Sequence, residues 1–218
     1  MSDQSRKYYG LEELDRKLER YLDYDSGYFV ELGANDGVSQ SNTCYFERSR
    51  GWRGVLIEPV VHNYFQCKRV RSRENHFFCN ACVSFEYSDA FVPVLYCNLM
   101  TTPLHVGTDI SNPVGHVASG QRHLPAGEEV VLFGASARTL HDILQEAKSP
   151  QVIDLLSLDV EGAEIEVLKG VDFSVFRFRY ICVECRSIKV MVPFLDKHGY
   201  ELVEHLQRND YLFRYVER

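Results

Sequence analysis

Acidic residues end several of the apolar segments of this chain. They are Glu58 at the end of residues 54–58, Asp159 at the end of residues 152–159 and Glu184 at the end of residues 180–184. If these segments are strands of an open parallel sheet, ligands bind outside their carboxyl ends. Carboxylates gathered there can bind hydroxyl groups, take up a proton or hold a cation. The sequence therefore predicts one acidic site assembled from distant parts of the chain.

Two glycines bracket a tight turn after the first predicted strand. Gly33 and Gly37 enclose Asn35, which is one of the few other residues that tolerates a left-handed backbone. Glu58 follows this turn at close to the spacing of about 20 residues at which an acidic side chain binds ribose hydroxyls. The turn lacks the second and third glycines that accommodate a pyrophosphate. The favoured ligand is therefore an adenosine compound without a pyrophosphate, which points to S-adenosylmethionine.

The elements that must position these residues alternate between strands and helices. Before the middle of the chain, helices are predicted within residues 1–25 and at about 42–50 and 63–70, and strands at 28–32, 54–58 and 76–79. After it, strands are predicted at 91–96, 129–133, 152–159 and 180–184, helices at 139–147, 161–169 and 190–197, and a terminal antiparallel hairpin at 200–206 and 211–216. Continuous apolar strands separated by helices indicate a mostly parallel sheet covered on both faces, a doubly wound α/β fold.

Residues 99–127 are rich in Gly, Pro, Ser and His and are predicted to be irregular. Such a long segment inside a compact domain is typically a lid or a binding loop. We expect residues 1–218 to form a single domain in which this insert lies over the substrate. His116, within it, is a candidate general base because imidazole titrates near neutrality. Arg122 and Arg138 are candidate anchors for an anionic group on the substrate, although exposed ion pairs are the simpler role for both.

The composition excludes several functional classes. The chain has 218 residues, of which 45% are hydrophobic and 25% charged, as in a globular domain rather than a disordered one. A net charge of −7 makes nucleic acid a poor partner. No run of residues approaches the roughly 18 apolar residues of a membrane helix, and the first residues contain no apolar signal core. We therefore expect a cytoplasmic protein without membrane contacts, whose seven cysteines are reduced.

Six segments resemble the FkbM family of S-adenosylmethionine-dependent methyltransferases. They are YFVELGANDG at 28–37, SNTCYFE at 41–47, GWRGVLIEP at 51–59, NACVS at 80–84, RTLHDIL at 138–144 and LLSLDVEGAE at 155–164. Their order and spacing match over about residues 27–206. The resemblance implies a Rossmann-like class I methyltransferase sheet of seven strands in the order 3-2-1-4-5-7-6. It also implies O-methylation of a hydroxyl on a small-molecule or glycan acceptor, such as a sugar or natural product.

The resemblance further implies roles for individual residues. The methionine end of the cofactor would contact Glu31, Gly33, Asn35 and Gly37, the ribose would contact Glu58, and the adenine would contact Asn80 and Ala81. The same cofactor site would include Ala34, Asn42, Pro59 and Asp159. The insert follows no pattern of the family, so the acceptor is not specified.

The candidate catalytic residues are Asp159, Glu161, Glu184 and His116. Methyl transfer to an alcohol needs the oxygen to be aligned with the methyl group and relieved of its proton. In the implied strand order, Asp159 and Glu184 end adjacent strands whose backbones lie about 5 Å apart. This pair can orient a hydroxyl or share a divalent cation such as Mg²⁺, and the sequence leaves both roles open. Simpler roles are an ion pair of Glu184 with Arg186 or Lys189, and stabilisation of a helix dipole by the acids that follow Asp159.

Two other functional classes stay open. A nicotinamide-dependent oxidoreductase is disfavoured by the missing glycines. A non-catalytic binding protein that keeps a methyltransferase fold is the main alternative, because a fold does not by itself imply a function.

Overall fold

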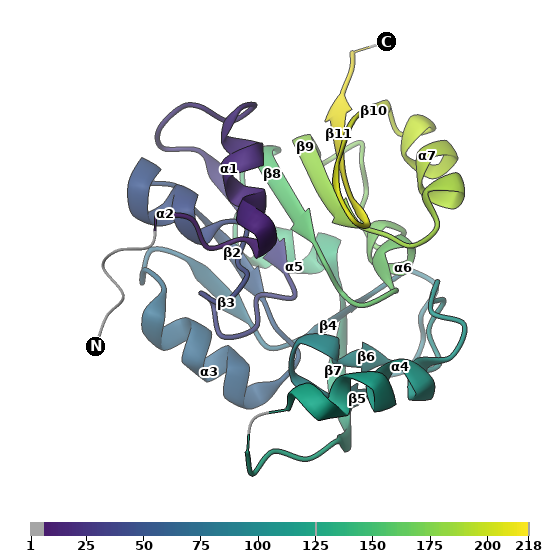
Figure 1. The fold of residues 1–218 in the computed structure, drawn as a ribbon. Coiled ribbons are helices and arrows are strands. Elements are labelled where there is room, and N and C mark those ends of the chain that lie inside the picture. Colours follow the sequence, from purple (N-terminus) through teal and green to yellow (C-terminus); the bar gives the residue numbers. More distant parts are fainter. Residues whose placement is uncertain (1–6, 125, 218) are drawn as a thin grey trace.

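The computed structural model describes residues 7–124 and 126–217, and its centre is a seven-stranded sheet (Figure 1). In spatial order the strands are β10 (Tyr200–Gln207), β11 (Asp210–Tyr215), β9 (Arg177–Glu184), β8 (Val152–Leu158), β1 (Tyr28–Leu32), β2 (Arg53–Ile57) and β3 (His76–Phe78). The five strands from β9 to β3 are parallel, whereas β11 is antiparallel to both β9 and β10. Numbered along the chain within this sheet alone, the order is 3-2-1-4-5-7-6. The C-terminal hairpin therefore inserts its second strand, β11, beside β9.

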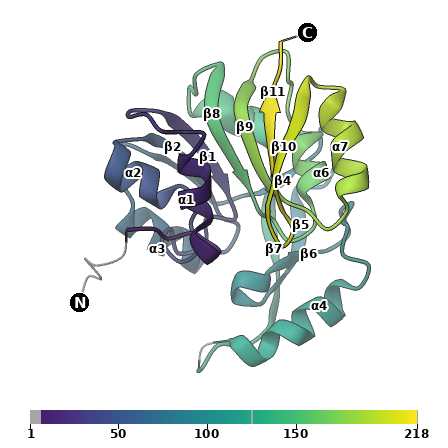
Figure 2. The ribbon, with the colours of Figure 1, turned by 45° about the horizontal axis from the view of Figure 1, so that its top comes forward.

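Short helices cover both faces of this sheet (Figure 2). One face carries α1 (Leu14–Glu19), α2 (Cys44–Arg50) and α3 (Val61–Val70), and the other carries α5 (Leu140–Glu146), α6 (Glu164–Leu168) and α7 (Ile188–Asp196). Two hydrophobic clusters join strands to helices, one on each face. Among the described residues, no helix is long and apolar enough to cross a bilayer.

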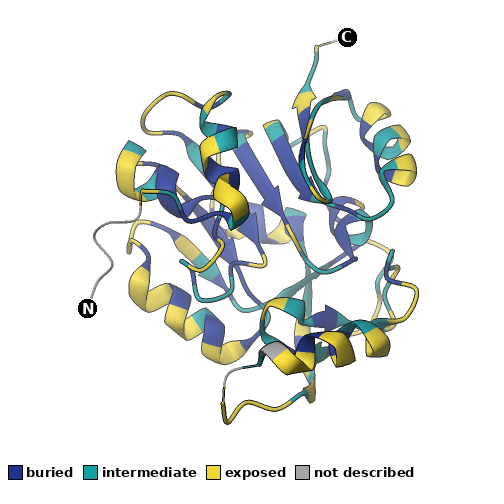
Figure 3. Ribbon diagram, in the orientation of Figure 1, coloured by how far each residue is buried: buried dark blue, intermediate teal, exposed yellow. Residues whose placement is uncertain are grey.

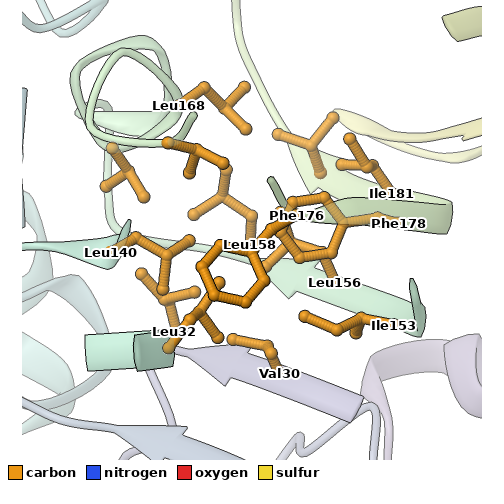
Figure 4. Close-up of a cluster of buried hydrophobic side chains, with 14 of the residues drawn as sticks. Val30, Leu32, Leu140, Ile153, Leu156, Leu158, Leu168, Phe176, Phe178 and Ile181 are labelled. Carbon is orange, nitrogen blue, oxygen red and sulfur yellow. The ribbon is translucent and has the colours of Figure 1, made fainter. Parts of the chain in front are cut away.

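The central strands are buried from both sides, as Figure 3 shows. Figure 4 shows Val30 and Leu32 of β1 packed with Leu156 and Leu158 of β8 and with Leu168 of α6. Each of these five side chains is at most 1% exposed. Full burial of such a side chain contributes about 1.5–3 kcal/mol. Burial on both faces explains why these strands are nearly continuous apolar runs rather than alternating ones.

A second, four-stranded sheet lies at the carboxyl ends of the parallel strands (Figures 1 and 2). Its order is β4 (Ala81–Val83), β7 (Val131–Thr139), β5 (Phe91–Tyr96) and β6 (Thr102–Pro103). Strands were expected at 91–96 and 129–133, and the second is longer than expected. We call this unit the small sheet.

The insert, residues 99–127, is more regular than the sequence suggested. It contains the end of a 3-10 turn (Asn98–Met100), strand β6, helix α4 (Pro113–Gly120) and a second 3-10 turn (Gln121–His123). Helix α4 has two ordinary start signals, because Asn112 Oδ1 accepts a hydrogen bond from the Gly115 N–H at 2.9 Å and Pro113 occupies the first turn. The expectation of an irregular segment was therefore wrong for this part.

Two predicted helices are shorter than expected. Glu12 and Glu13 have positive φ angles, of 50° and 57°, so a 3-10 turn (Leu11–Glu13) precedes a six-residue α1. The expected N-terminal helix also covers residues 1–6, which lie outside the described residues. The helix expected at 161–169 starts only at Glu164, because Glu161 and Gly162 have φ angles of 53° and 101°.

A buried arginine ties the end of β1 to the loop and helix that follow. Arg71 Nη1 lies 3.2 Å from Glu31 Oε2, and Arg71 Nε lies 2.9 Å from Glu47 Oε2. Arg71 is fully buried, and the two glutamates are 5% and 8% exposed. Glu31 also accepts hydrogen bonds from the hydroxyls of Ser41 and Thr43. This network fixes the path of the chain after the first strand.

Replacing Arg71 by Met is expected to lower the free energy of unfolding by about 3–5 kcal/mol, because two buried carboxylates lose their cationic partner. Urea denaturation measures the loss. Arg16→Met is the control, since Arg16 is 62% exposed and its ion pair with Glu13 lies on the surface. Equal unfolding midpoints for the two variants would contradict the role given to Arg71.

Candidate active site

A cavity of about 600 Å³ opens at the carboxyl ends of the parallel strands, between the main sheet and the small sheet. Most of the site residues expected from the sequence line it, namely Gly33, Asn35, Asn42, Glu58, Pro59, Asn80, Ala81, Asp159, Glu161 and Glu184. Four others lie outside the lining, namely Glu31, Ala34, Gly37 and His116. Glu31 belongs to the buried Arg71 network. Asp159 and Glu184, which follow or end the adjacent strands β8 and β9, line the same cavity, and their role as a site stays a prediction.

The turn after β1 brings the backbone close to the end of β8. Gly33 has a φ of +77°, and a Cβ atom there would lie 1.9 Å from the carbonyl oxygen of Asp159. Only glycine fits, because a side chain would have to displace backbone. Asn35, at a φ of 46°, donates its backbone N–H to Glu58 Oε2 at 2.8 Å. The turn and Glu58 therefore fix each other at the cavity.

Glu58 is a buried carboxylate with both oxygens held in place. Its Oε1 accepts a hydrogen bond from the Val60 N–H at 2.9 Å, while its Oε2 accepts the one from Asn35. Burial raises the pKa of Glu58 to about 7 although these two bonds oppose the shift. Each oxygen keeps acceptor capacity, so the pair can receive two neighbouring hydroxyl groups.

Apolar side chains of the small sheet line part of the cavity. Ala81 and Cys82 of β4 line it together with Val92 and Val94 of β5. Asn80, at its edge, donates its side-chain amide to the carbonyl of Ser136 at 3.2 Å. Small and branched apolar side chains of this kind can pack against a flat ring.

Carboxylates gather at the other end of the cavity. Asp159, Glu161 and Glu184 each offer one oxygen, and these oxygens lie within 4.8 Å of one another. Asp159 is accessible from the cavity but closely surrounded by protein. This enclosure, together with the negative charges of Glu184 and Glu161, raises the pKa of Asp159 well above its usual range. The cluster can therefore accept a proton, orient a hydroxyl or hold a cation.

Asp210 lines the same end of the cavity beside Glu184, although no sequence pattern predicted it as a site residue. It is the first residue of β11 and lies opposite Glu184 in the antiparallel ladder. Burial and the charge of Glu184 raise the pKa of Asp210 to about 6. The segment Arg208-Asn209-Asp210 indicated only a hairpin turn, and no local signal showed which strand would become its neighbour. Arg208 also lines the cavity and pairs with Glu12 at its mouth.

His116 stands behind the acidic cluster rather than in the cavity. Its Nε2 lies 3.0 Å from Glu161 Oε2, and its side chain is 18% exposed. Arg186 Nη2 lies 2.8 Å from the same Glu161 oxygen. Among the described residues, no ion pair joins Glu184 to Arg186 or to Lys189. His116 therefore contacts Glu161 but does not itself line the cavity.

The two candidate anion anchors lie away from the cavity lining. Arg138 pairs with Glu146 of α5 at 2.5 Å, as expected for an exposed ion pair. Arg122 belongs to the 3-10 turn after α4 and does not line the cavity.

The family of the chain follows from comparison with known sequences. A family model described as the methyltransferase FkbM domain matches residues 31–213. The match covers most of the chain and includes the turn after β1, Glu58, the acidic cluster and Asp210. The chain therefore belongs to the FkbM methyltransferase family. A search of the curated proteins found no match.

Solved structures show weaker similarity. A human methyltransferase 10 domain containing protein is 12% identical, with 93% of this chain and 81% of that chain covered and a TM-score of 0.44. A precorrin-6y C5,15-methyltransferase from Geobacter metallireducens is 11% identical, with 93% and 85% covered and a TM-score of 0.40. A methyltransferase from Thiobacillus denitrificans in complex with S-adenosyl-L-homocysteine is 12% identical, with 93% and 69% covered and a TM-score of 0.36. These scores are too low to inform the site.

Replacing Asp210 by Asn is expected to stabilise the protein at neutral pH. The folded-state pKa of about 6 exceeds the ordinary value of about 3.9, so the folded state binds more protons between these values. Stability should therefore fall as pH rises from about 4 to 6, and above pH 6 the variant should gain about 1–3 kcal/mol.

Thermal unfolding at pH 4 and at pH 8 tests this expectation, with the exposed Asp89→Asn as the control. The gain of Asp210→Asn should appear at pH 8 and vanish near pH 4. An Asp210→Asn variant less stable than wild type at pH 8 would show that the charge of Asp210 does not destabilise the folded protein.

Proposed function

We propose that this protein is an S-adenosylmethionine-dependent O-methyltransferase that acts on a hydroxyl of a sugar or another natural-product acceptor. The observation that carries the proposal is a single cavity with Glu58 near one end and the carboxylates of Asp159 and Glu184 at the other. Membership of the FkbM methyltransferase family supports it.

The residues present suit such a cofactor. The oxygens of Glu58 would receive the two ribose hydroxyls, and the apolar side chains of β4 and β5 that line the cavity would contact the adenine. The Gly33 turn lies between this end and Asp159, where the methionine part would run. The strand order β2-β1-β8-β9 then leaves the ends of β8 and β9 for the acceptor.

The acidic cluster would orient the acceptor and take up its proton. When bound, S-adenosylmethionine supplies an electrophilic methyl group on its sulfonium sulfur. Asp159 would accept the hydrogen bond from the acceptor hydroxyl and so hold its oxygen in line, while Glu184 would accept one from a neighbouring hydroxyl of the acceptor. As that oxygen gains the methyl group, its proton would pass to Asp159, whose raised pKa makes the ionised carboxylate a stronger base than an ordinary aspartate.

The insert would cover the acceptor. Leu99, Met100 and Val106 line the cavity from this segment. A small hydroxylated molecule with an apolar face would fit between these side chains and the carboxylates. This position supports the lid role expected from the sequence.

The same carboxylates offer a divalent cation such as Mg²⁺ three oxygens. Oxygen ligands are those that Mg²⁺ prefers, but it also needs near-octahedral geometry and retains several waters. The transfer assay below is therefore run both with added Mg²⁺ and with EDTA. Loss of transfer in EDTA, with cofactor binding retained, would place a cation in the acceptor site.

Replacing Glu58 by Ala is expected to weaken the binding of S-adenosylhomocysteine by about 10- to 100-fold, because charge-assisted hydrogen bonds to the ribose are lost. Calorimetric titration measures the dissociation constant, with NAD as a second titrant and the exposed Glu201→Ala as the matched control. Wild-type affinity in Glu58→Ala would contradict the ribose assignment. Binding of NAD in place of S-adenosylhomocysteine would instead favour a nicotinamide-dependent enzyme.

Methyl transfer itself is tested with methyl-labelled S-adenosylmethionine and a panel of sugars and hydroxylated natural products. Label should enter an acceptor with the wild-type protein, and Asp159→Asn should slow transfer by about 10²- to 10⁴-fold while S-adenosylhomocysteine still binds. Transfer at the wild-type rate in Asp159→Asn would refute the catalytic assignment. Binding without transfer to any acceptor would support the non-catalytic binding protein.

A further inference from the structure

Arg186 connects the acidic cluster to the segment 107–110 of the insert. It follows the end of β9, and its Nη2 lies 2.8 Å from Glu161 Oε2. Its backbone N–H donates to Asp109 Oδ2 at 2.7 Å, and the N–H of Ser187 donates to the same oxygen at 3.2 Å. Its Nη1 lies 3.8 Å from Asp109 Oδ1. One residue therefore contacts both a cavity-lining carboxylate and the insert.

The turn that carries Glu161 is strained, and contacts with the insert hold it in place. Glu161 has a φ of 53°, and Gly162 has a φ of 101°. A Cβ atom at Gly162 would lie 2.4 Å from Thr108 Oγ1, so the insert packs directly on this glycine. The Asp109 N–H also donates to the Gly162 carbonyl at 2.9 Å. A left-handed backbone at a non-glycine residue costs free energy, and it persists only where surrounding contacts fix it.

We propose that the Arg186 side chain is a positioning group for methyl transfer, which holds the Glu161 carboxylate beside Asp159, while the backbone N–H of the same residue bonds to Asp109 of the insert. This role rests on the proposed function, because Glu161 matters in this way only if the acidic cluster binds the acceptor. Arg186 acts through Glu161 and Asp109, and it is not among the residues that line the cavity.

The charges around Arg186 support this role. Although burial opposes the shift, the negative charges of Glu161, Glu184 and Asp109 raise the pKa of the Arg186 guanidinium, so the side chain keeps its charge. His116, on α4, contacts the same Glu161 oxygen from the insert side. A fixed positive charge at this point reduces the repulsion between Glu161 and the two carboxylates beside it. Without it, the pKa of Asp159, which the charges of Glu184 and Glu161 already raise, should rise further.

The test compares Arg186→Gln, Arg186→Lys and the control Arg214→Gln, which removes an exposed ion pair with Glu201. In Arg186→Gln, kcat should fall by about 10- to 100-fold, the size of loss that a displacement of about 1 Å can cause. The KM for S-adenosylmethionine and the affinity for S-adenosylhomocysteine should stay within about twofold of wild type. The acidic limb of the pH–rate profile should move to higher pH, because the ionised form of the base then needs a higher pH. Arg186→Lys should recover most of the loss.

Hydrogen exchange provides a readout that needs no acceptor. The Gly162 N–H, which donates to Glu164 Oε1 at 3.0 Å, should exchange at least about tenfold faster in Arg186→Gln than in wild type, since the turn loses the ion pair that holds Glu161. If Arg186→Gln does not fold, Asp109→Ala tests the contact from the insert side, because it removes the acceptor of the two backbone N–H bonds from Arg186 and Ser187, with an expected fall in kcat and faster exchange at Gly162.

The outcomes separate this inference from the proposed function. A wild-type protein that neither binds S-adenosylhomocysteine nor transfers a methyl group refutes the proposed function, and the role of Arg186 with it. Wild-type transfer combined with an unchanged kcat and pH profile in Arg186→Gln refutes the role of Arg186 alone. A loss of kcat that Arg186→Lys does not restore, with no movement of the pH profile, would reduce Arg186 to a merely structural residue.

Discussion

Repulsion between the carboxylates at one end of the cavity is the main constraint on how this site is built. Asp159, Glu161, Glu184 and Asp210 bring up to four negative charges into one small volume. The fold limits the repulsion in two ways, since Glu161 has cationic or titratable partners while Asp159 and Asp210 have raised pKa values. Strain of this kind is typical of sites where chemistry has been favoured over stability. In the proposed O-methyl transfer, such a carboxylate would serve as the proton acceptor that an unactivated alcohol requires.

The sheet creates this crowding from residues far apart in the chain. Parallel pairing places the ends of β2, β1, β8 and β9 at one edge, and the hairpin brings β11 beside β9 so that Asp210 faces Glu184. The small sheet and the insert then close the space above that edge. Behind the edge, the buried Arg71 network fixes the chain after β1, and the tight turn at Gly33 sets how closely β1 and β8 approach. The packing of β1 against its neighbours thus also sets where the cavity-lining residues lie.

Local sequence patterns were sufficient for the parts of the site that depend on strand ends. Glu58, Asp159 and Glu184 each end an apolar strand, and the geometry of parallel sheets brings such ends together without further information. Asp210 could not be predicted as a site residue, because its contact with Glu184 depends on the pairing of β11 with β9, which is a long-range contact. His116 could not be placed, because its position depends on the fold of the insert.

Left-handed backbone angles account for one further difference, and a buried ion pair accounts for another. The expected helix start at Glu161 was wrong, since left-handed angles at Glu161 and Gly162 delay the helix to Glu164. Glu31 carries the charge and position expected of a ligand-binding residue, but its carboxylate is used by the buried Arg71. In both cases a tertiary contact, which no local pattern encodes, outweighed the local preference.

The most direct test of the central claim is a crystal structure of the protein with S-adenosylhomocysteine. We expect the oxygens of Glu58 to lie within about 3.2 Å of both ribose hydroxyls, and the sulfur to face the carboxylates of Asp159 and Glu184. A nucleoside bound elsewhere, or one whose sulfur points away from these carboxylates, would contradict the account of how this cavity works.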